Sequence, residues 1–202
     1  MAQVTIKVGP QDHGRVMSLD DFDHAEGQEG YLYELGRGRV VVMDVPKLSH
    51  GLQVQAARHQ LEAYSIAHPG RIYYLAPGSD CKLLVEKLQS ERHPDLTIYK
   101  QPPDDEEDPW STWIPELVIK VVSPHSSETR DYEEKREEYL LFGVRECWIL
   151  DAAKETMTVL QRVSGRWKPR EVRPPEIYRP RLLPGLAFDC GTVFAAARSA
   201  SK

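Results

Sequence analysis

Two lysines occur where the surrounding sequence predicts a packed interior. Lys120 lies in the apolar run Pro115–Pro124, which is typical of a strand, and Lys135 lies in Arg130–Tyr139, which is typical of a helix. A buried ammonium group is unfavourable unless it is paired or used, so these two residues are the first candidates for chemistry. Strand side chains alternate between faces, which places Lys120 between two valines, in or beside a cleft.

The helical pattern gives Lys135 a similar setting. At 100° per residue, Tyr132, Lys135, Tyr139 and Phe142 share one side of the helix, so the lysine belongs to an aromatic stripe. Alternatively, Lys135 lays its methylene groups along the edge of the core and places its charge in water. Periodicity alone leaves both interpretations open.

Two acidic residues are candidate partners for these lysines. Asp95 opens a short strand, where its carboxylate faces the end of the sheet, and Glu34 is the one acid in the strand Tyr31–Leu35. The alternatives are a turn aspartate and an exposed edge glutamate. His50 and His93 are further candidate ligands or proton carriers, because histidine titrates near neutrality.

Composition places the chain among ordinary globular proteins. It has 202 residues, 41% of them apolar and 28% charged, which favours a single domain. No apolar run approaches the ~20 residues of a membrane span, and no signal peptide is recognised, so a cytoplasmic location without membrane contact is expected. Cys81, Cys147 and Cys190 are too far apart for a zinc pattern or a disulfide framework and are expected to be reduced.

Charge is unevenly distributed along the chain. The formal net charge of -5 argues against a protein whose whole surface binds nucleic acid. The run Asp104–Asp108 is expected to form an acidic loop. Between Arg162 and Arg181, however, seven basic residues face only Glu171 and Glu176. This segment either contacts phosphates or forms a solvated face with a proline-rich loop.

The pattern of the whole chain predicts an α/β fold, with a flexible arm at 1–17 and one domain at 18–202. Helices are expected from Ser18 to about Gly27, from Ser49 to about Ala67, at 129–142 and at 188–198. Strands are expected at 31–35, 39–43, 71–75, 82–85, 94–99, 115–122, 146–151 and 156–161, and an extended, proline-rich wrap at 168–184.

Several of these segments together resemble a known family. The chain is similar, over about residues 18–195, to the bacterial restriction-endonuclease-like family of the PD-(D/E)XK nuclease superfamily. The matching segments are 33–35, 93–95, 115–124, 130–135, 143–151 and 183–185. The resemblance implies a central mixed β-sheet flanked by helices. It also implies a metal-dependent DNA endonuclease that hydrolyses phosphodiester bonds with Mg²⁺ or Mn²⁺, and a homodimer is expected.

The resemblance also implies roles for particular residues. Glu34 and Asp95 match the family's metal-binding acids, and Lys135 matches its helix lysine. At Lys120 the family pattern requires a glutamate, so a cation replaces a metal ligand and joins Lys135 as a second candidate catalytic lysine.

This replacement changes the local charge by two units. One unit-charge contact at ~4 Å is worth about 1 kcal/mol in water and about 4 kcal/mol at an effective dielectric constant of 20. Metal binding is therefore expected to be weakened or lost. Three hypotheses remain: a metal-dependent nuclease, an inactive nucleic-acid-binding or regulatory relative in which Lys120 fills the metal site, and an unrelated α/β protein. Only Lys120 separates the first two.

Overall fold

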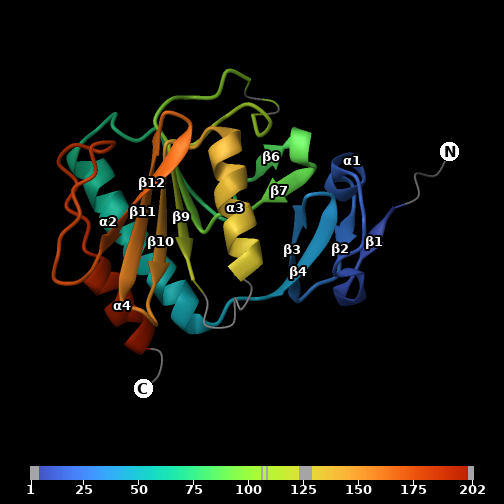
Figure 1. The fold of residues 1–202 in the computed structure, drawn as a ribbon, viewed down its shortest axis with the longest axis horizontal. Coiled ribbons are helices and arrows are strands. Elements are labelled where there is room, and N and C mark those ends of the chain that lie inside the picture. Colours follow the sequence, from blue (N-terminus) through green and yellow to red (C-terminus); the bar gives the residue numbers. More distant parts are fainter. Residues whose placement is uncertain (1–4, 106, 108, 123–128, 200–202) are drawn as a thin grey trace.

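The computed structural model describes residues 5–105, 107, 109–122 and 129–199, with the side chains of 129–132 excepted. A six-stranded mixed sheet carries helices on both faces, and a smaller four-stranded sheet lies at one end (Figure 1). This arrangement confirms the α/β fold class that the sequence predicts.

The large sheet has the strand order β12-β11-β10-β9-β8-β5. β9 and β10 are parallel and are connected through α3, while every other neighbouring pair is antiparallel. The elements are β5 (Tyr74–Pro77), β8 (Leu96–Tyr99), β9 (Leu117–Val121), α3 (Thr129–Phe142), β10 (Glu146–Asp151), β11 (Thr156–Val163) and β12 (Arg166–Val172).

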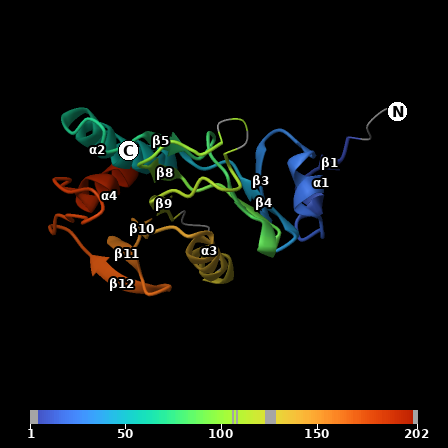
Figure 2. The ribbon, with the colours of Figure 1, turned by 90° about the horizontal axis from the view of Figure 1, so that it is seen from above.

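Alternation along β9 explains why both faces of this sheet are covered. Leu117, Ile119 and Val121 pack into a core with α2 (Leu48–Ala67) and α4 (Cys190–Ser199). Val118 points the other way, into a second core that includes Tyr139 of α3. Figure 2 shows α2 and α4 on one side of the strands and α3 on the other. Lys120 is on the α3 side, at the end of the strand.

The smaller sheet comes mainly from the N-terminal part of the chain. Its order is β4-β3-β7-β6, and a two-stranded pair of β1 and β2 packs beside it. The remaining elements are β1 (Lys7–Val8), η1 (Pro10–Asp12), α1 (Leu19–Asp23), β2 (Glu26–Gly27), β3 (Tyr31–Gly36), β4 (Arg39–Asp44), β6 (Leu83–Val85), η2 (Glu86–Leu88) and β7 (Ser90–Arg92).

Local sequence signals account for several boundaries. Ser18 caps α1 as expected, since its hydroxyl accepts a hydrogen bond from the Asp21 N–H at 3.1 Å. Helix α3 has the predicted bounds and ends at Gly143, whose φ of 110° is accessible to glycine at little cost. Ser49 is the expected cap of helix α2, but the N-cap residue is Lys47, two residues earlier, so Ser49 lies inside the helix.

The structure differs from the sequence predictions at both ends of the chain. Residues 7–8 pair with β2, and Val8 and Met17 are buried, so the described part of the predicted flexible arm is packed onto the small sheet. The predicted wrap begins instead as edge strand β12, which accommodates Pro169 because an outer strand does not need every N–H group. The division of the chain into an arm and one domain stays a prediction.

The three cysteines are free and buried, as expected. No described helix is long and apolar enough to cross a membrane.

Candidate functional site

Asp95 and Lys120 meet at the edge where β8 begins and β9 ends. The Lys120 ammonium group donates to Asp95 Oδ1 at 3.1 Å, and the backbone N–H of Val121 donates to Asp95 Oδ2 at 2.6 Å. The antiparallel pairing of β8 with β9 brings these groups together, because Leu96 lies opposite Ile119. The predicted position of Asp95 at the mouth of its strand is therefore what allows it to receive the lysine.

Glu34 and Lys135 form a second, deeper ion pair. Glu34 lies on β3 and is 1% exposed, and its Oε2 is 2.7 Å from the Lys135 ammonium nitrogen. The Arg92 guanidinium donates to the same oxygen at 3.0 Å, and the His93 backbone N–H donates to Oε1 at 3.2 Å. Lys135 therefore does not extend its charge into water, which decides between the two interpretations of its helical position.

Arg92 links this pair to a third carboxylate that the sequence reading missed. Arg92 and Glu138 are both fully buried, and the guanidinium Nε lies 2.5 Å from Glu138 Oε2. Nη2 of Arg92 and the Ser90 hydroxyl each donate to Glu138 Oε1 at 3.2 Å. A buried arginine is tolerated here because its planar donor groups are satisfied by two carboxylates.

The two ion pairs belong to one electrostatic unit. Burial alone would raise the pKa of Glu34, but Lys135, Arg92 and Lys120 outweigh burial and hold this pKa at about 2. Because Lys120 acts on Glu34 as well as on its own partner, we treat the six charged groups together as the ion-pair site. Its members are Glu34, Arg92, Asp95, Lys120, Lys135 and Glu138.

The two candidate histidines flank this site. His50, on α2, places Nε2 3.3 Å from Asp95 Oδ1. Burial lowers the pKa of His50, opposed by Asp95 and assisted by Lys120, which favours the neutral imidazole. His93 points away from the site, since its ring contacts the Glu91 carboxylate and the Cys81 carbonyl, each at 3.0 Å. His50 is the histidine whose side chain reaches the predicted acids.

The charges of the ion-pair site cancel. Within the six groups, three carboxylates, on Glu34, Asp95 and Glu138, face three cations, on Arg92, Lys120 and Lys135, so their formal sum is zero. The more exposed Arg37 approaches Glu138 from outside this set, with Nε 3.6 Å from Oε1. A glutamate in place of Lys120 would change this sum to −2, which equals the charge that one divalent cation balances.

The donor groups do not fit a divalent metal ion in this arrangement. Both oxygens of Glu34 and both oxygens of Asp95 accept hydrogen bonds or ion pairs from protein cations and N–H groups. In the described part of the chain, no group of three or more His, Cys, Asp or Glu side chains is arranged to hold a metal. A magnesium ion would have to displace Lys120, since it binds carboxylate oxygens directly.

Glu138 and Arg92 show what sequence reasoning missed. Glu138 follows Lys135 by three residues and so shares its buried face, a signal that was obscured by the neighbouring glutamates 133, 134 and 137. Arg92 lies on the three-residue strand β7, too short and too polar to produce an alternating pattern. The side chain of Tyr132, predicted on the same stripe, lies outside the described residues.

Comparisons with known proteins agree with this fold. The model of the Uma2 family, described as "Putative restriction endonuclease", matches residues 19–192. A solved structure from Anabaena variabilis, titled a "putative nuclease belonging to DUF820", superposes with a TM-score of 0.71 at 17% identity. The superposition covers 90% of this chain and 99% of that one. A search of curated proteins gives no match.

The fold and the matched family define a restriction-endonuclease-like protein. The chain belongs to the Uma2 family, since the family model spans most of its length. At 17% identity the solved structure supports the fold alone. Nucleases of this kind typically depend on metal ions.

Proposed function

We propose that this protein binds DNA and that Lys120 replaces the metal ion on which cleavage by its relatives depends. The protein would then be a catalytically inactive, nucleic-acid-binding member of its family. Nucleic acid is the partner that the family assignment suggests.

The contact between Lys120 and Asp95 carries this proposal. Both oxygens of Asp95 are already engaged within the protein, because Lys120 and the Val121 N–H donate to one oxygen each. At an effective dielectric constant of 20, a unit charge at ~4 Å contributes about 4 kcal/mol, so the fixed ammonium would oppose an incoming divalent ion by an amount of that order. The loss of a carboxylate ligand and the gain of a repulsive charge both lower the affinity for a divalent metal ion.

A second candidate function is metal-dependent DNA cleavage, the activity typical of the superfamily. The observation in its favour is the exposure of Lys120, whose side chain is 27% accessible, against 8% for Lys135. A partly exposed lysine can turn toward solvent at a lower cost than a buried one. If it does, Glu34 and Asp95 would hold Mg²⁺ or Mn²⁺, and the Lys135 ammonium would stabilise negative charge on the phosphate.

Titration of the wild-type chain with Mg²⁺ and Mn²⁺ by calorimetry separates these functions. The proposal expects no binding heat, DNA binding in the presence of EDTA and no nicking of a supercoiled plasmid. Metal-dependent nicking that disappears in Asp95→Ala would instead establish the second candidate. Absence of DNA binding at low salt would remove both.

A cytoplasmic location and a homodimer remain part of the proposal. Both accord with a nuclease-like DNA-binding protein, because symmetric pairs suit the two strands of a duplex. Sedimentation of the chain with and without DNA tests the dimer.

A further inference from the structure

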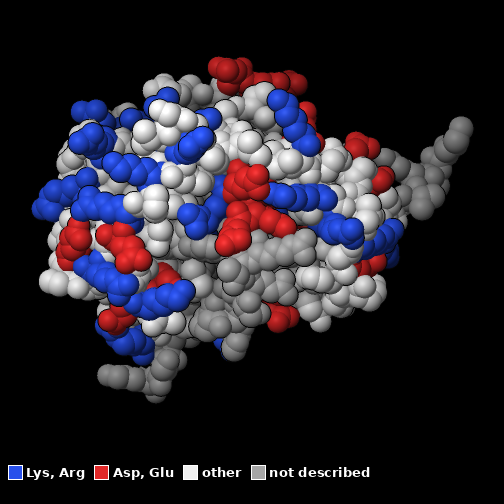
Figure 3. All heavy atoms as spheres, viewed as in Figure 1, with Lys and Arg blue, Asp and Glu red and all other residues white. Residues whose placement is uncertain are grey.

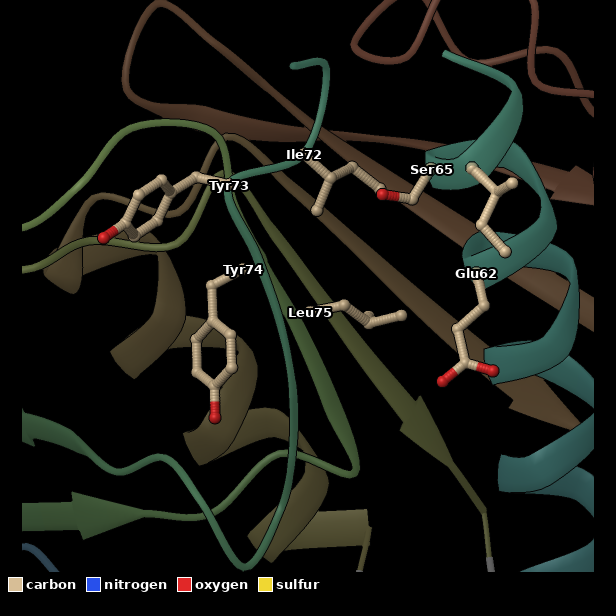
Figure 4. A pocket seen from close by; sticks show the side chains of 7 residues that line it. Glu62, Ser65, Ile72, Tyr73, Tyr74 and Leu75 are labelled. Atoms are coloured by element: carbon tan, nitrogen blue, oxygen red, sulfur yellow. The ribbon is translucent and has the colours of Figure 1, made fainter. Parts of the chain in front are cut away.

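The C-terminal half of the chain carries a concentrated basic surface outside the ion-pair site. We call it the basic face. Figure 3 shows blue side chains gathered at the left of the molecule, over the edge formed by β11 and β12 in Figure 1. Its residues are Arg162, Arg166, Lys168, Arg170, Arg173, Arg179 and Arg181, all exposed, with Glu171 and Glu176 as the acidic residues of the same segment.

Strand β12 arranges three of these residues in a row. Arg166, Lys168 and Arg170 alternate with Trp167 and Pro169, so their side chains leave the same face of the strand. Successive members are about 6.6 Å apart along the strand, at ~3.3 Å per residue. Pairing with β11 on one side only leaves this row at the open edge of the sheet.

Part of the basic face is already neutralised within the protein. Arg170 pairs with Glu176, and Arg173 lies 3.3 Å from Glu171. Five of the seven make no ion pair with any residue that the structure describes. Arg162 donates to the Gly143 carbonyl at 3.1 Å, which leaves Arg166, Lys168, Arg179 and Arg181. These four charges are available to an external anion.

A neighbouring acidic surface limits where a polyanion can lie. The outer side of α3 carries the exposed Glu133 and Glu137, of which Glu137 is paired with Arg37. Figure 3 shows acidic side chains in the centre of the view, beside the basic face. A phosphate chain is repelled there and attracted to the edge at β12. The charge pattern therefore favours one track rather than general adhesion, which agrees with the negative net charge of the whole chain.

Protection of an edge strand is the other reason why such residues occur. Charges and a proline on an outer strand prevent pairing with another chain, and β12 has both. Charges of either sign would protect the edge strand, so this purpose does not explain why nearly all of these residues are basic. It also does not account for Arg179 and Arg181, which lie in the segment after the strand and extend the same positive surface.

We propose that the basic face binds the phosphate backbone of double-stranded DNA. This inference rests on the proposed function, because it supplies the surface through which the DNA binding would occur. Guanidinium groups suit the task, since they donate to phosphate oxygens in pairs and always carry charge. Contacts of this kind hold the duplex without reading its sequence.

Charge reversal at three unpaired residues tests the inference. The variant Arg166→Glu/Lys168→Glu/Arg179→Glu is compared with wild type and with Lys7→Glu/Arg71→Glu/Lys87→Glu, in which three exposed lysines and arginines elsewhere undergo the same charge change. Affinity for a 20-base-pair duplex is measured against salt concentration, and circular dichroism confirms folding.

The expected result is specific to the basic face. Its variant loses at least tenfold in affinity at low salt, and the slope of log K against log salt falls by about 2 to 3, at ~0.9 per lost phosphate contact. The control variant changes much less. If both variants lose DNA affinity equally, or if the basic-face variant binds DNA as tightly as wild type, the inference about this surface is overturned. The proposal that the protein binds DNA would still stand. Preference for single-stranded DNA or RNA over the duplex also overturns it, whereas a wild type that binds no DNA removes the proposed function.

Discussion

The ammonium nitrogen of Lys120 lies 3.1 Å from Oδ1 of Asp95, and Lys120 also contributes to the low pKa of Glu34. One lysine thus acts on both acids that the family resemblance implies as metal ligands. Lys120 lies at the end of β9, on the face covered by α3.

Lys120→Glu is predicted to create a site for a divalent ion. The substitution changes the formal charge of the ion-pair site from zero to −2 and adds a carboxylate beside Asp95. Mn²⁺ at a hundred times its dissociation constant would stabilise the variant by about 2.7 kcal/mol, which corresponds to a rise in Tm of roughly 5 to 10 °C. Thermal unfolding of the variant with and without Mn²⁺ measures this rise in Tm.

Lys120→Gln is the matched control for that experiment. It removes the cation without adding a ligand, so its Tm should not respond to Mn²⁺. If Lys120→Glu folds and its Tm is equally insensitive to Mn²⁺, residue 120 is not part of a convertible metal site. A response in wild type would show that Lys120 yields to metal without any substitution.

Lys135→Met is predicted to destabilise the fold far more than Lys120→Met. Lys135 is paired with a fully enclosed carboxylate, and removal of one member of a buried pair typically costs about 3–5 kcal/mol. Arg92 remains beside Glu34 and reduces that cost, so about 2–4 kcal/mol is expected. Lys120 is partly exposed and should contribute about 1 kcal/mol. Urea unfolding of both variants provides the comparison, and similar losses would contradict the assigned difference in burial.

The central unit of the fold follows from sequence patterns, whereas the partners of its charges do not. Strand β9 has apolar residues on both faces, and α3 has a glycine stop, so both could be placed. Lys135 was recognised because it interrupts an aromatic stripe. The partner of Lys135 could not be derived, because the contact with Glu34 joins residues about a hundred positions apart and depends on how β3 docks against α3.

Short and edge strands show a different limit. Strand β7 has three residues, all polar and all buried, so neither alternation nor hydrophobicity marks it. Strand β12 contains Pro169 and four charged residues, which indicate an exposed wrap unless the strand is known to have one neighbour. In both cases tertiary contacts, rather than local preference, determine the structure.

Protonation of Glu34 is predicted to lower the free energy of unfolding as the pH is reduced from about 4.5 to about 2. Its pKa is held at about 2 in the folded chain, below the ordinary value of 4.5. A carboxyl group whose pKa is lowered by folding stabilises the fold at pH values above its pKa in the unfolded chain. It loses that contribution as the pH falls to its pKa in the folded chain. At 1.36 kcal/mol per pH unit, the contribution is about 3 kcal/mol.

Glu34→Gln isolates this effect from the other carboxylates. The variant should be less stable than wild type at pH 7, and the difference in unfolding free energy should shrink as the pH falls through this range. Urea unfolding at intervals between pH 6 and pH 2 measures the difference. A difference that stays constant with pH would show that Glu34 does not titrate in the expected way.

Gly36→Ala is predicted to destabilise the protein by displacing Arg92. A Cβ atom at Gly36 would lie 2.7 Å from Nη2 of Arg92 and 3.1 Å from its Cζ. The guanidinium cannot retreat freely, because Glu34 and Glu138 hold it on both sides. Overpacking of this kind costs about 1–3 kcal/mol.

Gly51→Ala is the control, since a Cβ atom there meets nothing within 4 Å and the residue lies inside helix α2. Alanine should stabilise that helix by about 0.5–1 kcal/mol. The free energy of unfolding, measured with urea, should therefore fall for Gly36→Ala and rise for Gly51→Ala. A neutral Gly36→Ala would mean that Arg92 can shift while keeping its carboxylate partners, and the close approach of β3 to this guanidinium would then not be required for the ion-pair site.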